Sequence, residues 1–329
     1  MKVIQAESAG GPEVLRLGEV DDPSPGPGEV LVRVAAAGVN FIDTYQRGGV
    51  YPVQFPFVPG SEGSGAVVAL GEGVTSLAVG DRVAWAEAPA SYADLVLVRA
   101  EVALPVPDGV DDETAAAVPL QGMTAHYLTA STFPVAEGQD VLVHAAAGGT
   151  GALVTQLAAA RGARVIATTS TPEKEARARA CGAAEVIRYT ELADLTRDLP
   201  AAVRDLTGGA GVHVVYDGVG KDTFDASLDS LRVRGTFVLF GGSSGQVPPF
   251  DLQRLNRAGS LYVTRPTLAA YTQDADERRW RARELFDAVT AGALQVRVDH
   301  RYPLADAARA HADLEARRTT GKLVLLPGA

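Results

Sequence analysis

One segment, residues 140–174, constrains the fold more than any other part of the chain. It reads DVLVHAAAGGTGALVTQLAAARGARVIATTSTPEK, a short apolar strand, a glycine-rich turn, an apolar helix and a second apolar strand. In a dinucleotide-binding turn, glycines allow a tight bend, close approach of the backbone to pyrophosphate and close packing of helix on strand. Ala146, Gly148 and Gly151 hold the three positions, so the first departs from glycine. Because free N–H groups at a helix start suit pyrophosphate, the segment predicts a dinucleotide site that includes Gly148, Gly149, Thr150 and Gly151.

The end of the second strand determines which dinucleotide this turn would bind. NAD-binding chains usually place an acidic residue there to hold the ribose 2′-hydroxyl group. This chain instead has hydroxyl residues from Thr168 to Thr171, followed by Pro172 and then Lys174. Hydroxyl groups and a lysine suit a 2′-phosphate, so we expect NADPH. Thr171 and Pro172 predict the start of a helix, where a lysine opposes the helix dipole unless an anion lies nearby; a solvated surface lysine is the alternative.

Strands and helices alternate along the middle of the chain. Strands are predicted at 140–145, 163–168, 184–189, 212–217 and 235–240, with helices at about 149–161, 172–181, from 191 and near 220–232. This alternation predicts a parallel sheet covered by helices on both faces. The first 120 residues differ, because their short apolar runs separated by turn signals predict a β-rich lobe with little helix.

The residues after about 265 are too few to form a domain alone. They contain helical stretches near 275–291 and 304–318 and a final apolar strand at 322–327. We expect these elements to pack on the β-rich lobe. The prediction is therefore an α/β protein with a discontinuous domain, residues 1–122 plus 266–329, and a doubly wound parallel-sheet domain inserted at 123–265.

The overall composition restricts the partners of the protein. A formal net charge of −10 opposes binding to nucleic acid or an anionic membrane, so an anionic cofactor depends on local donors. The chain has no run of 18 apolar residues and no basic start followed by an apolar run, so we expect a cytoplasmic protein. Its single cysteine, Cys181, excludes an internal disulfide and a cysteine-rich metal cluster.

Further short motifs extend over nearly the whole chain. They are GGPEV at 10–14, GVNFIDTY at 38–45, PGSEGSG at 59–65, VGDRV at 79–83, HAAAGGTG at 144–151, VVYDGVG at 214–220, FGGSSG at 240–245, GSLYVTRP at 259–266 and GK at 321–322. In these motifs the sequence closely resembles the quinone oxidoreductases, the zeta-crystallin-like, zinc-free branch of the medium-chain dehydrogenase/reductase superfamily. The resemblance implies a GroES-like catalytic domain, an inserted Rossmann domain, NADPH as cofactor and a homodimer formed through the edge of the Rossmann sheet.

Two positions distinguish this sequence from the zinc-dependent members of that superfamily. Those enzymes carry a cysteine where this chain has Asn40, and Gly-His-Glu where it has Gly60, Ser61 and Glu62. A catalytic zinc needs three protein ligands from Cys, His or carboxylate, and the histidines of this chain are scattered, so we expect no metal. Because zinc normally stabilises the alkoxide in alcohol oxidation, its absence favours a substrate that accepts hydride readily, such as a quinone.

The resemblance also implies the residues of the site. The segment from Asn40 to Tyr45 would lie against the nicotinamide, with Asn40, Tyr45 and Tyr51 as catalytic candidates. A turn residue is the alternative for Asn40, and a packed aromatic is the alternative for Tyr45. Residues 240–244 also follow the carboxyl end of a predicted strand, where ligands of open α/β sheets bind. The other implied cofactor contacts are Phe41, Ile42, Asp43, Thr44, Thr124, Ser170, Lys174, Tyr189, Phe240, Gly241, Ser243, Ser244, Arg265 and Lys322.

Some of these candidates have simpler explanations. Thr124 is equally well explained as a residue at a helix start, Tyr189 as a surface aromatic, and Arg265 and Lys322 as solvated charges at strand ends. Quinone reduction is the favoured function. The alternatives are reduction of an alkenal or enone double bond by the same hydride, and an RNA-binding or structural crystallin-like protein that retains an NADPH site. The acidic charge argues against RNA.

Overall fold

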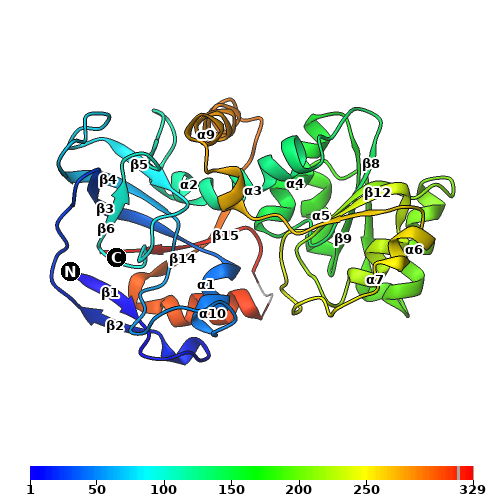
Figure 1. Cartoon of the computed structure of the whole chain (residues 1–329), viewed down its shortest axis with the longest axis horizontal. Helices are drawn as coiled ribbons and strands as arrows, with labels where there is room; N and C mark the ends of the chain where they lie inside the picture. Colours follow the sequence, from blue (N-terminus) through cyan, green and yellow to red (C-terminus); the bar gives the residue numbers. More distant parts are fainter. Residues whose placement is uncertain (317–318, 329) are drawn as a thin grey trace. The chain divides into compact units, whose positions relative to one another are not determined.

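The computed structural model describes residues 1–316 and 319–328, which form two compact units. The first unit comprises Met1–Met123 with Thr272–Ala329, and the second comprises Thr124–Tyr271. Figure 1 labels most of the helices and strands of both. Within the described part of the chain, no helix is long and apolar enough to cross a membrane.

The first unit is built on a seven-stranded sheet. Its main path runs in the order β14-β15-β3-β4-β5-β7, and β6 also pairs with β3. The long strand β3 (Glu29–Val39) pairs antiparallel with β15 (Lys322–Leu326), drawn in red in Figure 1, so the C-terminal segment completes a sheet begun near the N-terminus. The other strands are β4 (Gly63–Leu70), β5 (Arg82–Trp85), β6 (Leu95–Arg99), β7 (Leu104–Pro105) and β14 (Val298–Pro303), with a separate pair formed by β1 (Lys2–Gln5) and β2 (Arg16–Glu19).

Helices and a mostly aliphatic core surround this sheet. The helices are α1 (Phe41–Arg47), α2 (Asp112–Ala117), α3 (Pro119–Tyr127), which continues into the second unit, α9 (Ala275–Thr290) and α10 (Ala307–Glu315). The core joins valines of β3, β4 and β6 to Trp85, Tyr92 and Leu323. Burial of these side chains from both ends of the sequence holds the discontinuous unit together.

The second unit contains one sheet of six strands, all parallel, in the order β10-β9-β8-β11-β12-β13. The strands are β8 (Asp140–Val143), β9 (Arg164–Thr169), β10 (Glu185–Arg188), β11 (Val212–Asp217), β12 (Leu231–Leu239) and β13 (Tyr262–Thr264). The helices are α4 (Gly149–Ala160), α5 (Pro172–Ala180), α6 (Leu195–Leu206), α7 (Phe224–Asp229) and α8 (Gln253–Arg257). The chain order reverses between β8 and β11, and in open parallel sheets ligands bind beside such a switch point. The predicted α/β fold class is confirmed.

Several predicted boundaries were wrong. The first lobe contains more helix than expected, because α2 begins at Asp112, where the Asp111 side chain caps the backbone N–H of Thr114 at 2.8 Å. Strand β14 was missed, since only one of its residues, Tyr302, is fully buried and its sequence lacks a clear apolar alternation. The helix expected near 220–232 is limited to α7, because β12 already begins at Leu231.

Candidate active site

The glycine turn joins β8 to α4. Ala145 adopts a left-handed φ of 51°, and the helix then begins behind Gly148, an N-cap residue with no side chain to accept a hydrogen bond. A Cβ atom at Gly151 would lie 2.4 Å from the carbonyl oxygen of Ala145, so only glycine lets the helix pack this closely on the turn. The first backbone N–H groups of α4 therefore remain available for an anion.

A buried histidine lies immediately before this turn. His144 Nε2 is 2.9 Å from Ser227 Oγ, and the Ser227 hydroxyl donates to Asp217 Oδ2 at 3.0 Å. Because that hydroxyl has one proton, His144 Nε2 must be the donor to Ser227, and Nδ1 accepts from Thr168 Oγ1 at 3.0 Å. Burial lowers the pKa of His144, which agrees with a neutral ring. This chain of bonds connects the carboxyl ends of β9, β8 and β11.

Asp217 organises the loop that follows β11. Its Oδ1 accepts from the backbone N–H groups of Val219 and Gly220 at 2.7 and 3.0 Å, and its Oδ2 also accepts from Thr223 Oγ1 at 2.7 Å. Four donors, including Ser227, therefore converge on one fully buried carboxylate. Asp217 lies in a motif recognised in the sequence, but no role was predicted for this residue.

Residues 240–244, the predicted cofactor-binding segment after β12, are hydrogen-bonded to that same loop. The backbone N–H groups of Phe240 and Ser243 donate to the carbonyl oxygens of Asp217 and Gly218 at 2.9 and 3.2 Å. The Ser244 hydroxyl donates to the Val219 carbonyl at 2.8 Å, so this candidate side chain is already engaged within the loops. Both loops lie beyond the carboxyl ends of adjacent strands, where Phe240, Gly241, Ser243 and Ser244 were expected.

The residues proposed for the 2′-phosphate adjoin one another. Thr171 caps α5 by accepting from the backbone N–H of Lys174 at 3.3 Å, and Pro172 is the first helical residue, as predicted. The Thr190 hydroxyl donates to the Ser170 carbonyl at 2.8 Å, which holds the turn carrying Tyr189 beside this helix start.

Two further candidates differ in their surroundings. Arg265 is exposed just after β13, and its guanidinium donates to the Pro266 carbonyl at 3.2 Å. Thr124 lies within α3 and is only 9% exposed, so the explanation of Thr124 as a helix-start residue is wrong.

Helix α1 in the first unit carries the expected catalytic segment. The loop after the helix folds back, because the backbone N–H groups of Val50 and Tyr51 both donate to the Tyr45 carbonyl, at 2.9 and 3.3 Å. The Phe41 and Tyr45 ring centroids are 6.2 Å apart, and those of Tyr45 and Tyr51 are 5.9 Å apart. These three rings form an aromatic row, while Ile42 and Tyr51 are each 39% exposed.

Asn40 is buried immediately before α1, and its amide is committed to neighbouring side chains. Its Nδ2 donates to Glu62 Oε2 at 2.8 Å, and its Oδ1 accepts from Lys322 Nζ at 2.7 Å and from Gln121 Nε2 at 3.1 Å. Lys322 also forms an ion pair with Glu62, whose other oxygen accepts from the Leu120 backbone N–H at 2.7 Å. Lys322 is therefore not a solvated charge at a strand end, and that explanation is wrong.

A second buried network contains Asp43 of α1. Tyr92 Oη lies 3.0 Å from Asp43 Oδ2 and 3.1 Å from His311 Nε2, while Arg47 contacts His311 Nδ1 at 3.0 Å and Glu315 at 2.7 Å. Burial raises the pKa of Asp43 to about 7 and lowers that of His311 to about 3. Burial also holds the pKa of Tyr92 well above its usual value. Only Asp43 among these residues was predicted from the sequence, because no local pattern links positions so far apart in the chain.

The described residues offer little for a metal ion. Among the described residues, no group of three or more His, Cys, Asp or Glu side chains is placed to hold one. Glu62, the carboxylate beside Asn40 and Ser61, already accepts hydrogen bonds on both oxygens. These donors and acceptors do not fit a catalytic zinc, which requires three free protein ligands.

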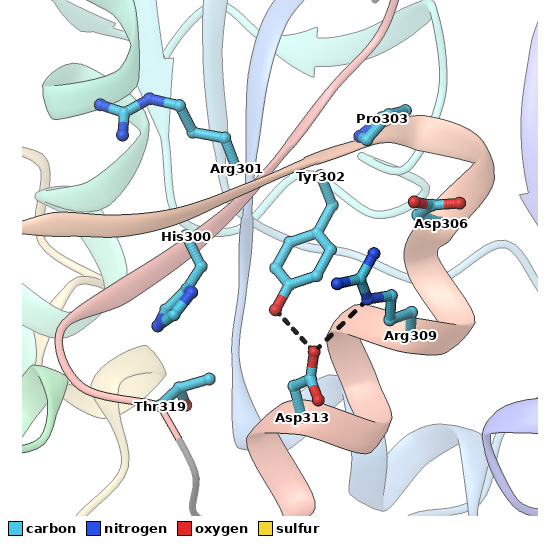
Figure 2. Close-up of a pocket in the computed structure, with 8 residues that line it drawn as sticks. All are labelled: His300, Arg301, Tyr302, Pro303, Asp306, Arg309, Asp313 and Thr319. Carbon is cyan, nitrogen blue, oxygen red and sulfur yellow. Dashed lines mark hydrogen bonds and ion pairs between the residues drawn. The ribbon is translucent and has the colours of Figure 1, made fainter.

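The first unit also has a surface pocket, and none of its lining residues was predicted from the sequence to be functional. It has a volume of about 310 Å³ and is lined by His300, Arg301, Tyr302, Pro303, Asp306, Arg309, Asp313 and Thr319 (Figure 2). Within it, the Tyr302 hydroxyl donates to Asp313 Oδ2 at 2.9 Å, and Arg309 Nε is 3.9 Å from the same oxygen. We assign no function to this pocket, because Tyr302 and Arg309 pair with Asp313 and Arg301 pairs with Glu113 outside the pocket.

The first unit is a sheet completed by the C-terminal segment, and the second unit is a parallel sheet with a glycine turn after its first strand. These two features together define a medium-chain dehydrogenase/reductase. In agreement, residues 26–132 match the family model described as alcohol dehydrogenase GroES-like domain, and residues 181–325 match the one described as zinc-binding dehydrogenase. The chain belongs to the quinone oxidoreductase family within this superfamily, and the predicted resemblance is confirmed.

Individual relatives match over nearly the full length. The chain is 46% identical to a quinone oxidoreductase of Pseudomonas aeruginosa, with 99% of each chain covered. It is 53% identical to a mycobacterial protein whose structure was solved in complex with NADPH, with a TM-score of 0.96 and coverage of 99% of this chain and 100% of that one. It is also 43% identical to a 2-haloacrylate reductase of Burkholderia sp, with 97% of each chain covered.

Proposed function

We propose that this protein is a zinc-independent oxidoreductase that uses NADPH to reduce a quinone. The observation that carries the proposal is the close packing of Gly151 on the Ala145 carbonyl, which leaves the uncapped start of α4 as an anion site beside the switch point of the sheet. Full-length similarity to quinone oxidoreductases, and to a protein solved with NADPH, supports the same conclusion.

The second unit supplies the proposed binding groups for the adenosine and pyrophosphate parts of NADPH. Gly148, Gly149, Thr150 and Gly151 would contact the pyrophosphate through backbone N–H groups. Ser170, Lys174 and Tyr189 would hold the 2′-phosphate, and the hydroxyl of Thr169 is buried there with no partner among the described residues. The loops fastened by Asp217 would position Phe240, Gly241 and Ser243. Arg265 and Thr124 are further proposed contacts.

The first unit supplies the proposed catalytic segment. Bound NADPH would provide a hydride, and the side chains would orient the acceptor and exclude water. The aromatic row of Phe41, Tyr45 and Tyr51 suits a planar conjugated ring. Asn40 and Lys322 would act by fixing the start of α1, because the side chains of both are engaged with Glu62. Ile42, Asp43 and Thr44 complete this segment.

The chemistry of these same residues supports the proposed zinc independence. Asn40 and Ser61 are not zinc ligands, and the Lys322 ammonium lies against Glu62. Reduction of a quinone does not require a Lewis acid, because the added charge spreads over the conjugated ring and the product is aromatic.

A second candidate reaction is reduction of an activated carbon–carbon double bond. The similarity to a 2-haloacrylate reductase favours it, since such substrates accept the same hydride. An RNA-binding or structural role remains a weaker proposal, because the net charge of −10 opposes polyanions.

We also propose a homodimer formed through β13 at the edge of the parallel sheet. Exposed apolar side chains gather on or near this edge: Tyr262 on β13 and Val233 on the neighbouring β12 are 61% and 66% exposed. An edge strand with apolar side chains favours pairing with a second strand. A cytoplasmic location is likewise proposed, by analogy with the family.

Steady-state kinetics test the proposed function. NADPH and NADH are each supplied with 1,4-benzoquinone, with 2-hexenal and with 2-chloroacrylate, and cofactor oxidation is followed by absorbance. We expect NADPH with benzoquinone to give the highest kcat/KM. If a double-bond substrate is preferred, the second candidate reaction replaces the first. If none of the three accelerates NADPH oxidation while NADPH still binds, the enzyme proposal is wrong.

A further inference from the structure

A chain of hydrogen bonds runs through the interior of the first unit and ends on helix α1. We call it the Asp43 chain, and it consists of Asp43, Tyr92, His311, Arg47 and Glu315. Only Glu315 has an exposed carboxylate, at 36%, while Asp43, Tyr92 and His311 are fully buried. The Asp43 chain therefore connects the catalytic segment proposed above to the Glu315 carboxylate at the surface.

The direction of each bond in the Asp43 chain is fixed by its members. Arginine only donates, so His311 Nδ1 accepts from Arg47 at 3.0 Å. Burial keeps the pKa of His311 low, so the ring is neutral and its single proton lies on Nε2. Nε2 then donates to Tyr92 Oη at 3.1 Å, and the Tyr92 hydroxyl donates to Asp43 Oδ2 at 3.0 Å.

These bonds leave the two oxygens of Asp43 in different situations. Oδ2 accepts from Tyr92 and also from the backbone N–H of Asn40 at 2.8 Å. Oδ1 is buried without a hydrogen-bond partner among the described residues. Any proton that Asp43 binds must therefore lie on Oδ1.

The charges around Asp43 already balance without it. Lys322 of β15 pairs with Glu62, which precedes β4, and Arg47 of α1 pairs with Glu315 of α10. An ionised Asp43 adds one buried negative charge to these two neutral pairs. Burial and Glu62 raise the pKa of Asp43, while the Asn40 N–H, Tyr92 and Lys322 lower it. Both protonation states are consequently populated near neutral pH.

The protonation state of Asp43 acts on helix α1. Asp43 is the third residue of the helix, and its Oδ2 holds the backbone N–H of Asn40, directly before Phe41. A carboxylate accepts this bond more strongly than a carboxylic acid does, and a negative charge in the first turn of a helix interacts favourably with the helix dipole. The start of α1, and with it the aromatic row of Phe41, Tyr45 and Tyr51, is held more firmly when Asp43 is ionised.

We propose that Asp43 is a positioning residue whose ionisation fixes the start of α1, so that the Asp43 chain makes the catalytic rate depend on pH across the neutral range. The inference rests on the proposed function for its effect on rate, but not for its effect on α1. The rate should rise with pH through one ionisation and then level off. The reaction itself is unchanged, because Asp43 transfers no proton to the substrate in this scheme.

The test combines a pH profile with a direct view of the helix. We would measure kcat and KM for benzoquinone between about pH 5.5 and 8.5 for the unaltered protein, Asp43→Asn and Tyr92→Phe. Asp43→Asn mimics the protonated carboxyl, so its kcat should be low and should lose the inflection. Tyr92→Phe removes a donor to the charged form and should move the inflection upward by about one pH unit. Tyr302→Phe is the matched control, since it also removes a tyrosine-to-carboxylate bond in the same unit (Figure 2).

NMR provides a readout that does not depend on catalysis. With ¹³C-labelled aspartate and tyrosine, we expect one carboxyl to titrate near neutral pH and the Tyr45 ring signals to follow the same curve. Both changes should be absent from Asp43→Asn. The inference is overturned if Asp43→Asn keeps the inflection, if Tyr302→Phe moves it as far as Tyr92→Phe does, or if the Tyr45 signals ignore the carboxyl titration. An inactive protein whose Tyr45 signals still follow Asp43 would reject the proposed function alone.

Discussion

His311 and Tyr92 are 219 residues apart in the sequence, yet Nε2 of the histidine lies 3.1 Å from the tyrosine hydroxyl. Their rings meet edge-on, with centroids 5.7 Å apart. Arg47 fixes the tautomer of His311 by donating to Nδ1, and the bond to Tyr92 joins α10, near the end of the chain, to the loop before β6. The contact thus links two segments that are distant in the sequence, and it is the central hydrogen bond of the Asp43 chain.

The stability of the protein should depend on pH through two opposing groups. Asp43 has its pKa raised from 3.8 to about 7, so its contribution is present at low pH and is lost as pH rises through 7. His311 has its pKa lowered from 6.5 to about 3, so its contribution is present above 6.5 and is lost as pH falls through 3. Between 3.8 and 6.5 the two effects oppose each other, each with a slope of about 1.4 kcal/mol per pH unit.

Single substitutions should reveal how each group makes the free energy of unfolding depend on pH. Asp43→Asn leaves His311 unopposed, so the free energy of unfolding should fall as the solution is acidified. His311→Gln leaves Asp43 unopposed, so that free energy should instead fall as pH rises from about 4 to 7. Urea unfolding at several pH values measures both. Parallel pH profiles for the two variants would contradict the assignment.

Gly151→Ala should damage cofactor binding. The added Cβ would lie 2.4 Å from the Ala145 carbonyl oxygen, so the turn must shift away from α4. We expect the Kd of NADPH to rise about tenfold or more, from a strain of about 1–3 kcal/mol at the anion site. Gly18→Ala is the control, because its nearest neighbour is a flexible side chain at 3.8 Å. Titration calorimetry measures both, and equal affinities would argue against the proposed site.

Asp217→Asn should disturb the loops that would hold the cofactor. An asparagine retains one acceptor oxygen and turns an NH₂ group toward buried donors, two of which are the backbone N–H groups of Val219 and Gly220. We expect a loss of about 2–4 kcal/mol in stability and a KM for NADPH that rises more than kcat falls. The same change at Asp229, which is 48% exposed, should cost less than about 0.5 kcal/mol. A result in which kcat alone changes would exclude a role in cofactor binding.

Lys174→Ala should reduce discrimination between the two nicotinamide cofactors. Lys174 lies in the first turn of α5, where a cation is unfavourable unless it binds an anion. We expect kcat/KM for NADPH to fall about tenfold or more while that for NADH changes little. Lys2→Ala, at an exposed lysine of the first unit, should change neither value. An equal loss with both cofactors would show that Lys174 does not recognise the 2′-phosphate.

The sequence was informative wherever function depends on adjacent residues. Strand, glycine turn and helix follow one another in the segment around Gly148 and Gly151, and the helix start at Thr171 and Pro172 was predicted correctly. These features depend on backbone geometry and local capping, which short patterns encode.

Local sequence patterns could not predict the buried hydrogen-bond networks. Asp43 and Tyr92 are 49 residues apart and meet through the tertiary packing of the first unit, while Arg47 and His311 are 264 apart and meet because α10 packs on α1. The same cause explains Lys322, whose commitment to Glu62 was not foreseen. No periodicity reports which distant polar groups will satisfy one another in a core.

The pairing of β15 with β3 also determines the order in which the protein can mature during synthesis. The second unit is one continuous stretch, Thr124–Tyr271, and can complete its sheet as soon as that stretch has left the ribosome. The first unit must wait for Lys322–Leu326, and until then Ala37–Val39 of β3 lack their strand partner on one edge and Glu62 lacks its cation. A nascent chain that stalls before residue 322 therefore exposes unpaired backbone N–H and C=O groups of β3, which can pair with another chain unless a chaperone covers them.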